Sequence, residues 1–175
     1  RGMMPDANDV YKALRRFASR RLQVEIDKAY QALQEAPDDQ YRKLELAAKL
    51  IMVQKHDAAI NLLGFKPLDE ETAGRRLLLL ARAFWGRREA VAAMELLRQV
   101  PLEGHPFSRF QLEACYLLGQ CYESLGNYAG AAAAYRRVYM DQTDFRDVRA
   151  RMEWSAERAV LKELEHRGTM LEASA

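Results

Sequence analysis

Cysteine, proline and glycine are scarce in this chain, and neither sign of charge dominates it. Of 175 residues, two are cysteine, five are proline and nine are glycine. Two cysteines exclude a small disulfide-stapled protein. Cys115 and Cys121 would lie about 240° apart around a helix, so we expect two free, buried thiols. The 27 basic and 25 acidic side chains leave a net charge of +2, which does not favour nucleic acid or anionic lipid as a partner.

Long apolar runs are also lacking. The longest, such as residues 77–81, are far shorter than the ~20 residues that a membrane span needs. The chain shows no charged-then-apolar leader and does not begin with methionine, which suggests part of a longer protein. We therefore expect a soluble segment. Its compartment stays open between the cytoplasm, the periplasm and a membrane surface reached through parts of the protein outside these residues.

Residues that favour helices are abundant. Hydrophobic residues make up 49% of the chain and charged residues 30%, and the apolar positions recur every three or four residues between turn signals. Asp69, followed by two glutamates, predicts a helix N-cap, and Ser108 with Gln111 predicts a capping box. No strand-like alternation lies between two turn signals, so we predict an all-α fold. Residues 9–36 hold no glycine or proline and predict either one long helix or two.

The helical segments repeat along the chain. In three places a large residue precedes an alanine by nine positions: Leu50 and Ala59, Phe84 and Ala93, Tyr122 and Ala131. Successive alanines are 34 and 38 residues apart, and the four additional residues fit a loop around Pro101, Gly104 and Pro106. Units of this length, each burying an apolar face against the next copy, are typical of helical-repeat proteins.

The third copy carries the most specific pattern: Leu118, Gly119, Tyr122, Gly126, Tyr128, Ala131 and Tyr135. On these residues the chain resembles the tetratricopeptide repeat family, although Cys115 stands where the family usually has tryptophan and Thr143 where it usually has proline. The resemblance implies a right-handed superhelix of stacked antiparallel helix pairs. It also implies an N-terminal helical segment (a degenerate repeat or cap) at residues 1–39, followed by three repeats at about residues 40–73, 74–111 and 112–143. A C-terminal capping helix is expected at residues 144–167 and a tail at residues 168–175.

Small residues are expected where two helices of a repeat cross closely. We expect Gly119 and Ala131 to admit each other's backbone, with Tyr122 and Tyr135 filling the space on either side. The closing helix, from residue 144 to 166, carries many arginines and glutamates, which we expect on a solvated outer face.

Motifs that carry catalysis or hold cofactors are lacking. His56, His105 and His166 are isolated, without a second histidine or a cysteine at metal-ligand spacing. The sequence contains no glycine-rich phosphate loop and no nucleophile elbow. Its acidic pairs stand at helix starts, where the helix dipole explains them. We therefore predict no enzyme activity, no cofactor and no metal site.

The resemblance implies a binding groove, because the first helix of each repeat lines a concave, peptide-binding face in that family. Carried over onto this chain, the groove consists of Tyr41, Leu44, Ala48, Ile51, Arg75, Leu78, Arg82, Trp85, Glu113, Tyr116, Gln120 and Glu123, with Trp154 of the closing helix on the same side. Aromatic and arginine side chains concentrate binding energy at interfaces, and Arg75 and Arg82 are expected to hold a carboxylate. The chaperone-tail clamp of some family members is missing, since Leu44, Ala48 and Tyr116 stand where it needs polar contacts.

Two classes of function follow from the sequence. The first is a non-catalytic scaffold or adaptor that binds a peptide or protein segment, with acidic or carboxylate groups, in the groove. The second is a self-association element whose interface buries Trp85 or Trp154, because stacked repeats leave uncovered apolar faces at their ends. A ligand-sensing domain of a regulator is a third alternative, which nothing in the residues distinguishes from the first. Nucleic acid is not an expected partner.

Overall fold

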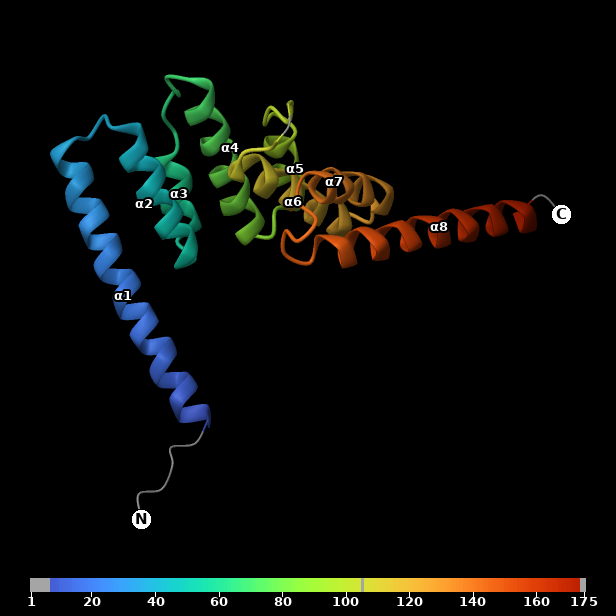
Figure 1. Cartoon of the computed structure of the whole chain (residues 1–175), viewed down its shortest axis with the longest axis horizontal. Helices are drawn as coiled ribbons and strands as arrows, with labels where there is room; N and C mark the ends of the chain where they lie inside the picture. The colour runs from blue at the N-terminus through green and yellow to red at the C-terminus, as the bar shows by residue number, and fades with distance from the viewer. Residues whose placement is uncertain (1–6, 105, 174–175) are drawn as a thin grey trace, which may run out of the picture. The chain divides into compact units, whose positions relative to one another are not determined.

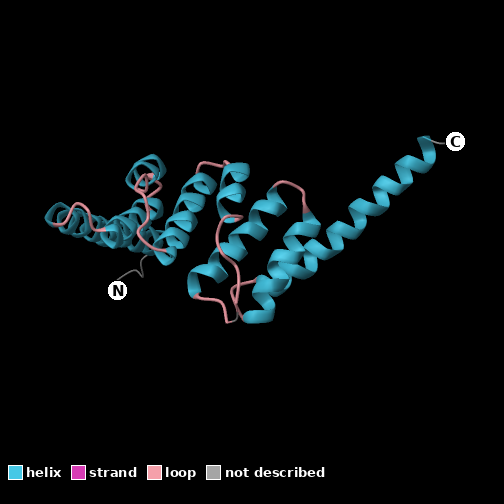
Figure 2. Cartoon of the chain, turned by 90° about the horizontal axis from the view of Figure 1, so that it is seen from above, coloured by secondary structure: helices cyan, strands magenta, loops and turns pink. Residues whose placement is uncertain are grey.

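The computed structural model describes the backbone of residues 7–104 and 106–173 and the side chains of residues 18–104 and 106–167. His105 lies outside the described residues. Those described form eight α-helices and no strand (Figures 1 and 2), so the predicted all-α class is confirmed. The helices are α1 (Ala7–Glu35), α2 (Gln40–Met52), α3 (His56–Leu62), α4 (Glu70–Gly86), α5 (Ala90–Leu97), α6 (Arg109–Ser124), α7 (Tyr128–Asp141) and α8 (Val148–Ala173).

The chain divides into two compact units, Arg1–Lys66 with α1 to α3 and Pro67–Ala175 with α4 to α8. Of the two alternatives for the glycine-free stretch near the N-terminus, the structure has the single helix: α1 runs unbroken. In the first unit, Ile26 and Ala29 of α1 and Leu46 of α2 form a small buried core. The first helix therefore packs against the second through apolar residues one turn apart.

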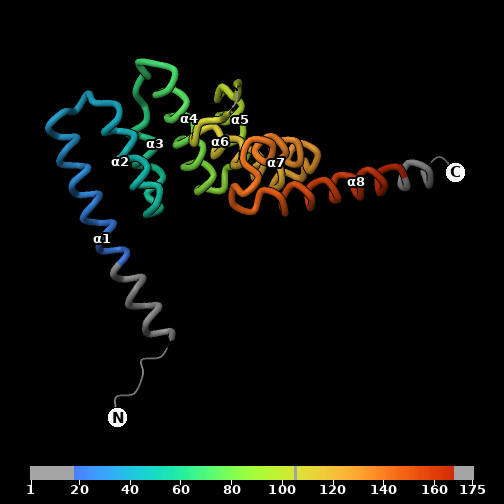
Figure 3. Tube along the Cα trace, in the orientation of Figure 1, coloured from blue at the N-terminus to red at the C-terminus, as the bar shows by residue number. Residues whose placement is uncertain are grey.

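In the second unit, two helix pairs and a closing helix pack in chain order (Figure 3). One buried cluster joins α4, α5 and α6 and includes Leu78, Ala81, Ala93, Leu97, Ala114, Leu118 and Cys121. A second cluster joins α6, α7 and the start of α8 and includes Leu112, Cys115, Tyr116, Ala131, Tyr135, Val138 and Val148. Each pair therefore covers the apolar face that its predecessor leaves bare, as in a helical solenoid.

The three helix-turn-helix links share one backbone conformation. Gln54, Arg88 and Gly126 each occupy the middle of a three-residue link, with φ of 62°, 64° and 70°. The residue after each donates its N–H to a carbonyl five residues back at 2.9 Å, in the pairs Lys55 to Leu50, Glu89 to Phe84 and Asn127 to Tyr122. These links are 34 and 38 residues apart, like the alanines of the sequence pattern. The sequence repeat is thus a repeat of backbone geometry, although two links place a residue other than glycine in the left-handed region.

Two of the predicted helix caps are confirmed. The carboxylate of Asp69 accepts a hydrogen bond from the backbone N–H of Thr72 at 2.7 Å at the start of α4. Ser108 and Gln111 form the capping box of α6, and the Gln111 side chain accepts the Ser108 N–H at 2.9 Å. Local sequence signals therefore predict where α4 and α6 begin, and these are the first helices of the two helix pairs in the second unit.

The helix bounds differ from the predicted segment bounds. Helix α4 begins at Glu70, ahead of the repeat boundary predicted at residue 74. Helix α8 begins at Val148 rather than at residue 144 and continues to Ala173, past the predicted end at residue 167. The division of the chain into repeats stays a prediction.

An aromatic ring lies next to Gly119, in the space that a side chain there would need. A Cβ atom at Gly119 would lie 2.5 Å from Cε1 of Tyr135, whose side chain is fully buried. Gly119 therefore makes room for the Tyr135 ring of α7, and the close approach to the backbone at Ala131 stays a prediction. In the same way Gly74 of α4 makes room for the Phe110 ring of α6, which would lie 2.8 Å from an added Cβ. In both places an aromatic ring of one helix occupies the space that a side chain on the neighbouring helix would need. The absence of that side chain lets α6 approach α7 and lets α4 approach α6.

Candidate functional site

Four of the predicted groove residues lie on α2 of the first unit. Tyr41 is exposed, Ala48 and Ile51 are half-buried, and Leu44 is buried. Leu44 is therefore an interior residue, contrary to the prediction that it lines a binding surface.

The other predicted residues belong to α4, α6 and α8 of the second unit. Exposed or half-buried among them are Arg75, Arg82, Trp85, Glu113, Gln120, Glu123 and Trp154. Leu78 and Tyr116 are buried, also contrary to prediction, and Leu78 packs in the core shared by α4, α5 and α6. The helical register predicts which way a side chain points, but it does not predict whether a neighbouring helix buries that side chain.

The two arginines expected to hold a carboxylate have different surroundings. Arg75 pairs with Glu71 one turn earlier on α4, at 2.7 Å between Nη2 and Oε1. Arg82, two turns further along the same helix, forms an ion pair with Glu113 of α6. Arg82 therefore takes part in a contact between helices, whereas Arg75 pairs along its own helix.

Three arginines surround the Glu113 carboxylate. Besides Arg82, Arg109 Nε lies 3.0 Å and Arg146 Nη2 4.0 Å from Glu113 Oε1. We name these four residues the Glu113 cluster; they come from α4, α6 and the loop before α8. Burial lowers the pKa of the Arg82 guanidinium, and the charges of Arg146 and Arg109 lower it further. The cluster therefore holds an excess of positive charge.

A second polar cluster connects α6 with α8. Arg151 Nη1 donates to Glu123 at 2.7 Å and its Nε donates to Asp147 at 2.9 Å. The buried Ser155 hydroxyl donates to Glu123 at 3.2 Å, and the Tyr116 hydroxyl donates to Asp147. Burial alone raises the pKa of Asp147, but the Tyr116 hydrogen bond and the Arg151 charge outweigh it, and the pKa lies below its ordinary value.

Aromatic rings lie beneath the arginines of both clusters. The Arg146 guanidinium lies 5.1 Å from the ring centroids of both Tyr116 and Phe145. Arg109 lies 5.7 Å from the Phe145 ring and Arg151 lies 5.9 Å from the Tyr116 ring. Cation–π contacts of this kind hold a guanidinium in place while its N–H groups remain directed to other partners. Tyr116 thus contributes to the site from the interior, as a support.

Sequence reasoning missed Arg109, Arg146, Asp147 and Arg151. It placed the arginines of the closing helix on a solvated outer face, whereas Arg151 is half-buried between two carboxylates. A signal was available, because Asp147, Arg151 and Ser155 recur every four residues and so share a helix face. Arg146 gave no such signal, since it lies in the loop before α8 with φ of 51°.

Trp154 stands beside this charged surface. It is partly exposed and, with Glu123, Ala150 and Arg151, lines a shallow depression. The Tyr128 ring packs edge-on against it, at 5.5 Å between centroids and 89° between planes. An exposed indole next to half-buried charges is a suitable anchor point for a partner side chain.

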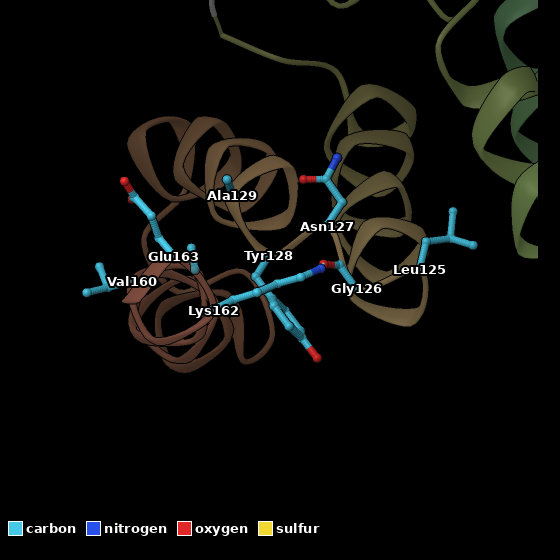
Figure 4. A pocket seen from close by; sticks show the side chains of 9 residues that line it. Leu125, Gly126, Asn127, Tyr128, Ala129, Val160, Lys162 and Glu163 are labelled. Atoms are coloured by element: carbon cyan, nitrogen blue, oxygen red, sulfur yellow. The ribbon is translucent and has the colours of Figure 1, made fainter. Parts of the chain in front are cut away.

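A further depression lies where the link between α6 and α7 meets α8 (Figure 4). Figure 4 shows Lys162 reaching from α8 toward Gly126, and its Nζ donates to the Gly126 carbonyl at 2.7 Å. The same ammonium lies 5.8 Å from the Tyr128 ring centroid. These contacts hold α8 against the link between α6 and α7. The depression is therefore part of a packing contact within the chain.

The described part of the chain holds neither a metal-binding cluster nor a helix able to cross a membrane. Within it, no group of three His, Cys, Asp or Glu side chains is placed to hold a metal ion. Within the same residues, no helix combines the length and the apolar character that crossing a bilayer requires.

Comparison with known proteins identifies the fold. Two crystal structures of MamA resemble this chain. One is 20% identical, with a TM-score of 0.65 over 87% of this chain and 81% of that one. The other is 19% identical, with a TM-score of 0.59 over 95% of this chain and 99% of that one. No family model and no curated protein matches the sequence. The chain therefore has a tetratricopeptide-like helical-repeat fold, as its turns and stacked helix pairs also indicate.

Proposed function

We propose that this chain is a non-catalytic protein-interaction module that binds a peptide or protein segment on the surface formed by α4, α6 and α8. It would serve as a scaffold or adaptor of a larger protein or complex. The observation that carries this proposal is the convergence of half-exposed arginines, carboxylates and Trp154 from three helices onto one surface. Arginine and tryptophan are the residue types that dominate binding energy at protein interfaces.

The chemistry of the surface supports binding rather than catalysis. The carboxylates of Glu113 and Glu123 each pair with an arginine of another helix, so their oxygens are engaged within the chain rather than directed at a substrate. The two hydroxyl groups of the cluster around Arg151 are both donated to carboxylates: the buried Ser155 hydroxyl to Glu123 and the Tyr116 hydroxyl to Asp147.

Membership of the tetratricopeptide repeat family is part of the proposal. The 34- and 38-residue spacing of the links supports it, as does the common left-handed conformation at Gln54, Arg88 and Gly126. Fold likeness alone does not carry function, so the binding role rests on the surface and not on the family.

The test of the binding role is selection of peptides followed by substitution at the surface. A random 12-residue peptide library on phage is panned against the whole chain, and recovered peptides are measured by fluorescence anisotropy. We expect Trp154→Ala to weaken binding about tenfold or more, as loss of an interface anchor does. Met140→Ala is the matched control, since Met140 is an exposed apolar residue on α7. Recovery of no peptide above background, or equal binding by both variants, would contradict the proposal.

Self-association is a second candidate function, favoured by one observation. Val160, Leu161 and Leu164 are exposed on α8, and Figure 1 shows the C-terminal end of this helix extending past α7. An exposed apolar stripe on a helix is a suitable contact for a second copy. Light scattering over a hundredfold concentration range decides the matter. A mass twice the monomer's 20.1 kDa that reverts in Val160→Glu/Leu164→Glu would favour self-association, and a constant monomer mass would exclude it.

A further inference from the structure

The Glu113 cluster holds more hydrogen-bond donors and more positive charge than its carboxylate satisfies. Three guanidinium groups carry three charges and five N–H donors each, against one carboxylate with two oxygens. Two positive charges remain after Glu113 is counted. An incoming anion would therefore find both charge and unused donors at this place.

The exposure of the side chains shows where an anion can approach. The Glu113 side chain is 15% exposed, whereas Arg82 is 34%, Arg146 is 47% and Arg109 is 76% exposed. Glu113 thus lies at the base of the cluster and the arginines open toward solvent. The outer edges of their guanidinium groups are the accessible part.

Arg146 is held in position before any partner binds. Its backbone lies in the left-handed region, at φ of 51°, a conformation that residues other than glycine rarely adopt. Its guanidinium lies over two rings, those of Tyr116 and Phe145. A fixed arginine loses less side-chain entropy when it binds, so this arrangement favours recognition of a planar carboxylate.

We propose that Arg82, Arg109 and Arg146 bind the carboxylate of an aspartate or glutamate, so that the partner of this module is an acidic peptide segment. The inference rests on the proposed function and names the chemistry of the partner. Glu113 occupies the same guanidinium groups in the free protein and competes with the incoming carboxylate. Arg75, paired with Glu71 along its own helix, stands outside this site.

Peptides recovered by panning the whole chain test the inference through their composition. We expect aspartate and glutamate to be enriched over the starting library. Arg109→Glu/Arg146→Glu changes the local charge by four units, and each unit at ~6 Å in water is worth about threefold in affinity, so acidic peptides should bind about a hundredfold more weakly. Arg98→Glu/Arg136→Glu, at exposed positions of the second unit, carries the same change in net charge and should leave binding within about threefold. Circular dichroism and thermal melting establish that both variants are folded.

Glu113→Gln provides a change of opposite sign at the same place. Removing the competing carboxylate should tighten binding of the acidic peptides by about threefold. Recovered peptides without acidic enrichment would overturn the inference while leaving the binding module intact, as would acidic peptides that bind the Arg109/Arg146 variant undiminished. Recovery of no peptide at all would overturn the proposed function itself, and this inference with it.

Discussion

The left-handed links between helices allow a prediction whose sign is unusual. Replacing a residue by glycine normally destabilises a protein, because glycine loses more backbone entropy on folding, by about 0.5–1 kcal/mol. Arg88 lies at φ of 64°, where any residue with a Cβ pays about 1–2 kcal/mol. The net effect of Arg88→Gly should be a gain of about 0.5–1 kcal/mol over Arg88→Ala, which removes the same side chain and keeps the strain.

The same comparison of glycine with alanine applies at Gln54 and Gly126, the middle residues of the other two links. Gln54→Gly should exceed Gln54→Ala in stability by a similar amount, since Gln54 has φ of 62°. Gly126→Ala should lose about 0.5–1 kcal/mol or more. A Cβ there meets only Lys162 Nζ at 3.5 Å, an ordinary contact, so the loss is one of backbone strain.

Urea unfolding followed by circular dichroism measures these differences, and thermal melting should shift by about 2–4 °C per kcal/mol for a chain of this size. The comparison of glycine with alanine at one position cancels the loss of side-chain contacts. If Arg88→Gly and Gln54→Gly were both less stable than their alanine counterparts, the common turn geometry would be refuted, and with it the structural basis of the repeat.

Other predictions concern the core of the second unit. Ala131→Arg should lower the melting temperature by about 10 °C, because Ala131 is fully buried and a long charged side chain would overpack the contact between α6 and α7; an unchanged melting temperature would show that the repeat register is wrong. Burial raises the pKa of the Cys115 and Cys121 thiols to about 11 and about 12, so neither should react with Ellman's reagent at pH 8 until the chain is unfolded; fast reaction of one thiol in the native protein would contradict this. Because the same thiols ionise near pH 9 when unfolded, the stability they contribute is complete below pH 9 and decreases as pH rises toward 11 and 12. The urea midpoint should fall over that range, and less steeply in Cys115→Ala/Cys121→Ala; equal slopes would contradict the assignment.

The fold could be predicted because its determinants are local. The cap residues Asp69 and Ser108 and the periodic apolar positions act over a few residues, so their meaning survives without knowledge of the neighbours. Of the three left-handed links, only the one at Gly126 could be predicted from the sequence, because glycine is a recognisable turn residue. Gln54 and Arg88 stand at the same place in the other copies, yet their side chains carry no turn signal.

The binding surface could be predicted only in part, because it depends on which helices meet. The register found Arg82 and Glu113 but gave no means of pairing them across α4 and α6. It could not tell that Tyr116 is covered by α7 and the loop before α8 and acts from below as a support. Arg146 belongs to that loop, where no helical period applies, so its position becomes known only when the chain is folded.

The most direct test of the binding account is a map of backbone amide chemical shifts, recorded by NMR while an acidic peptide recovered from the library is added to the whole chain. If the peptide binds on this surface, the shift changes should concentrate on α4, α6 and α8, around Arg82, Glu113 and Arg151. Changes concentrated instead on α5 and α7, or around Lys162, with none near Glu113, would contradict it.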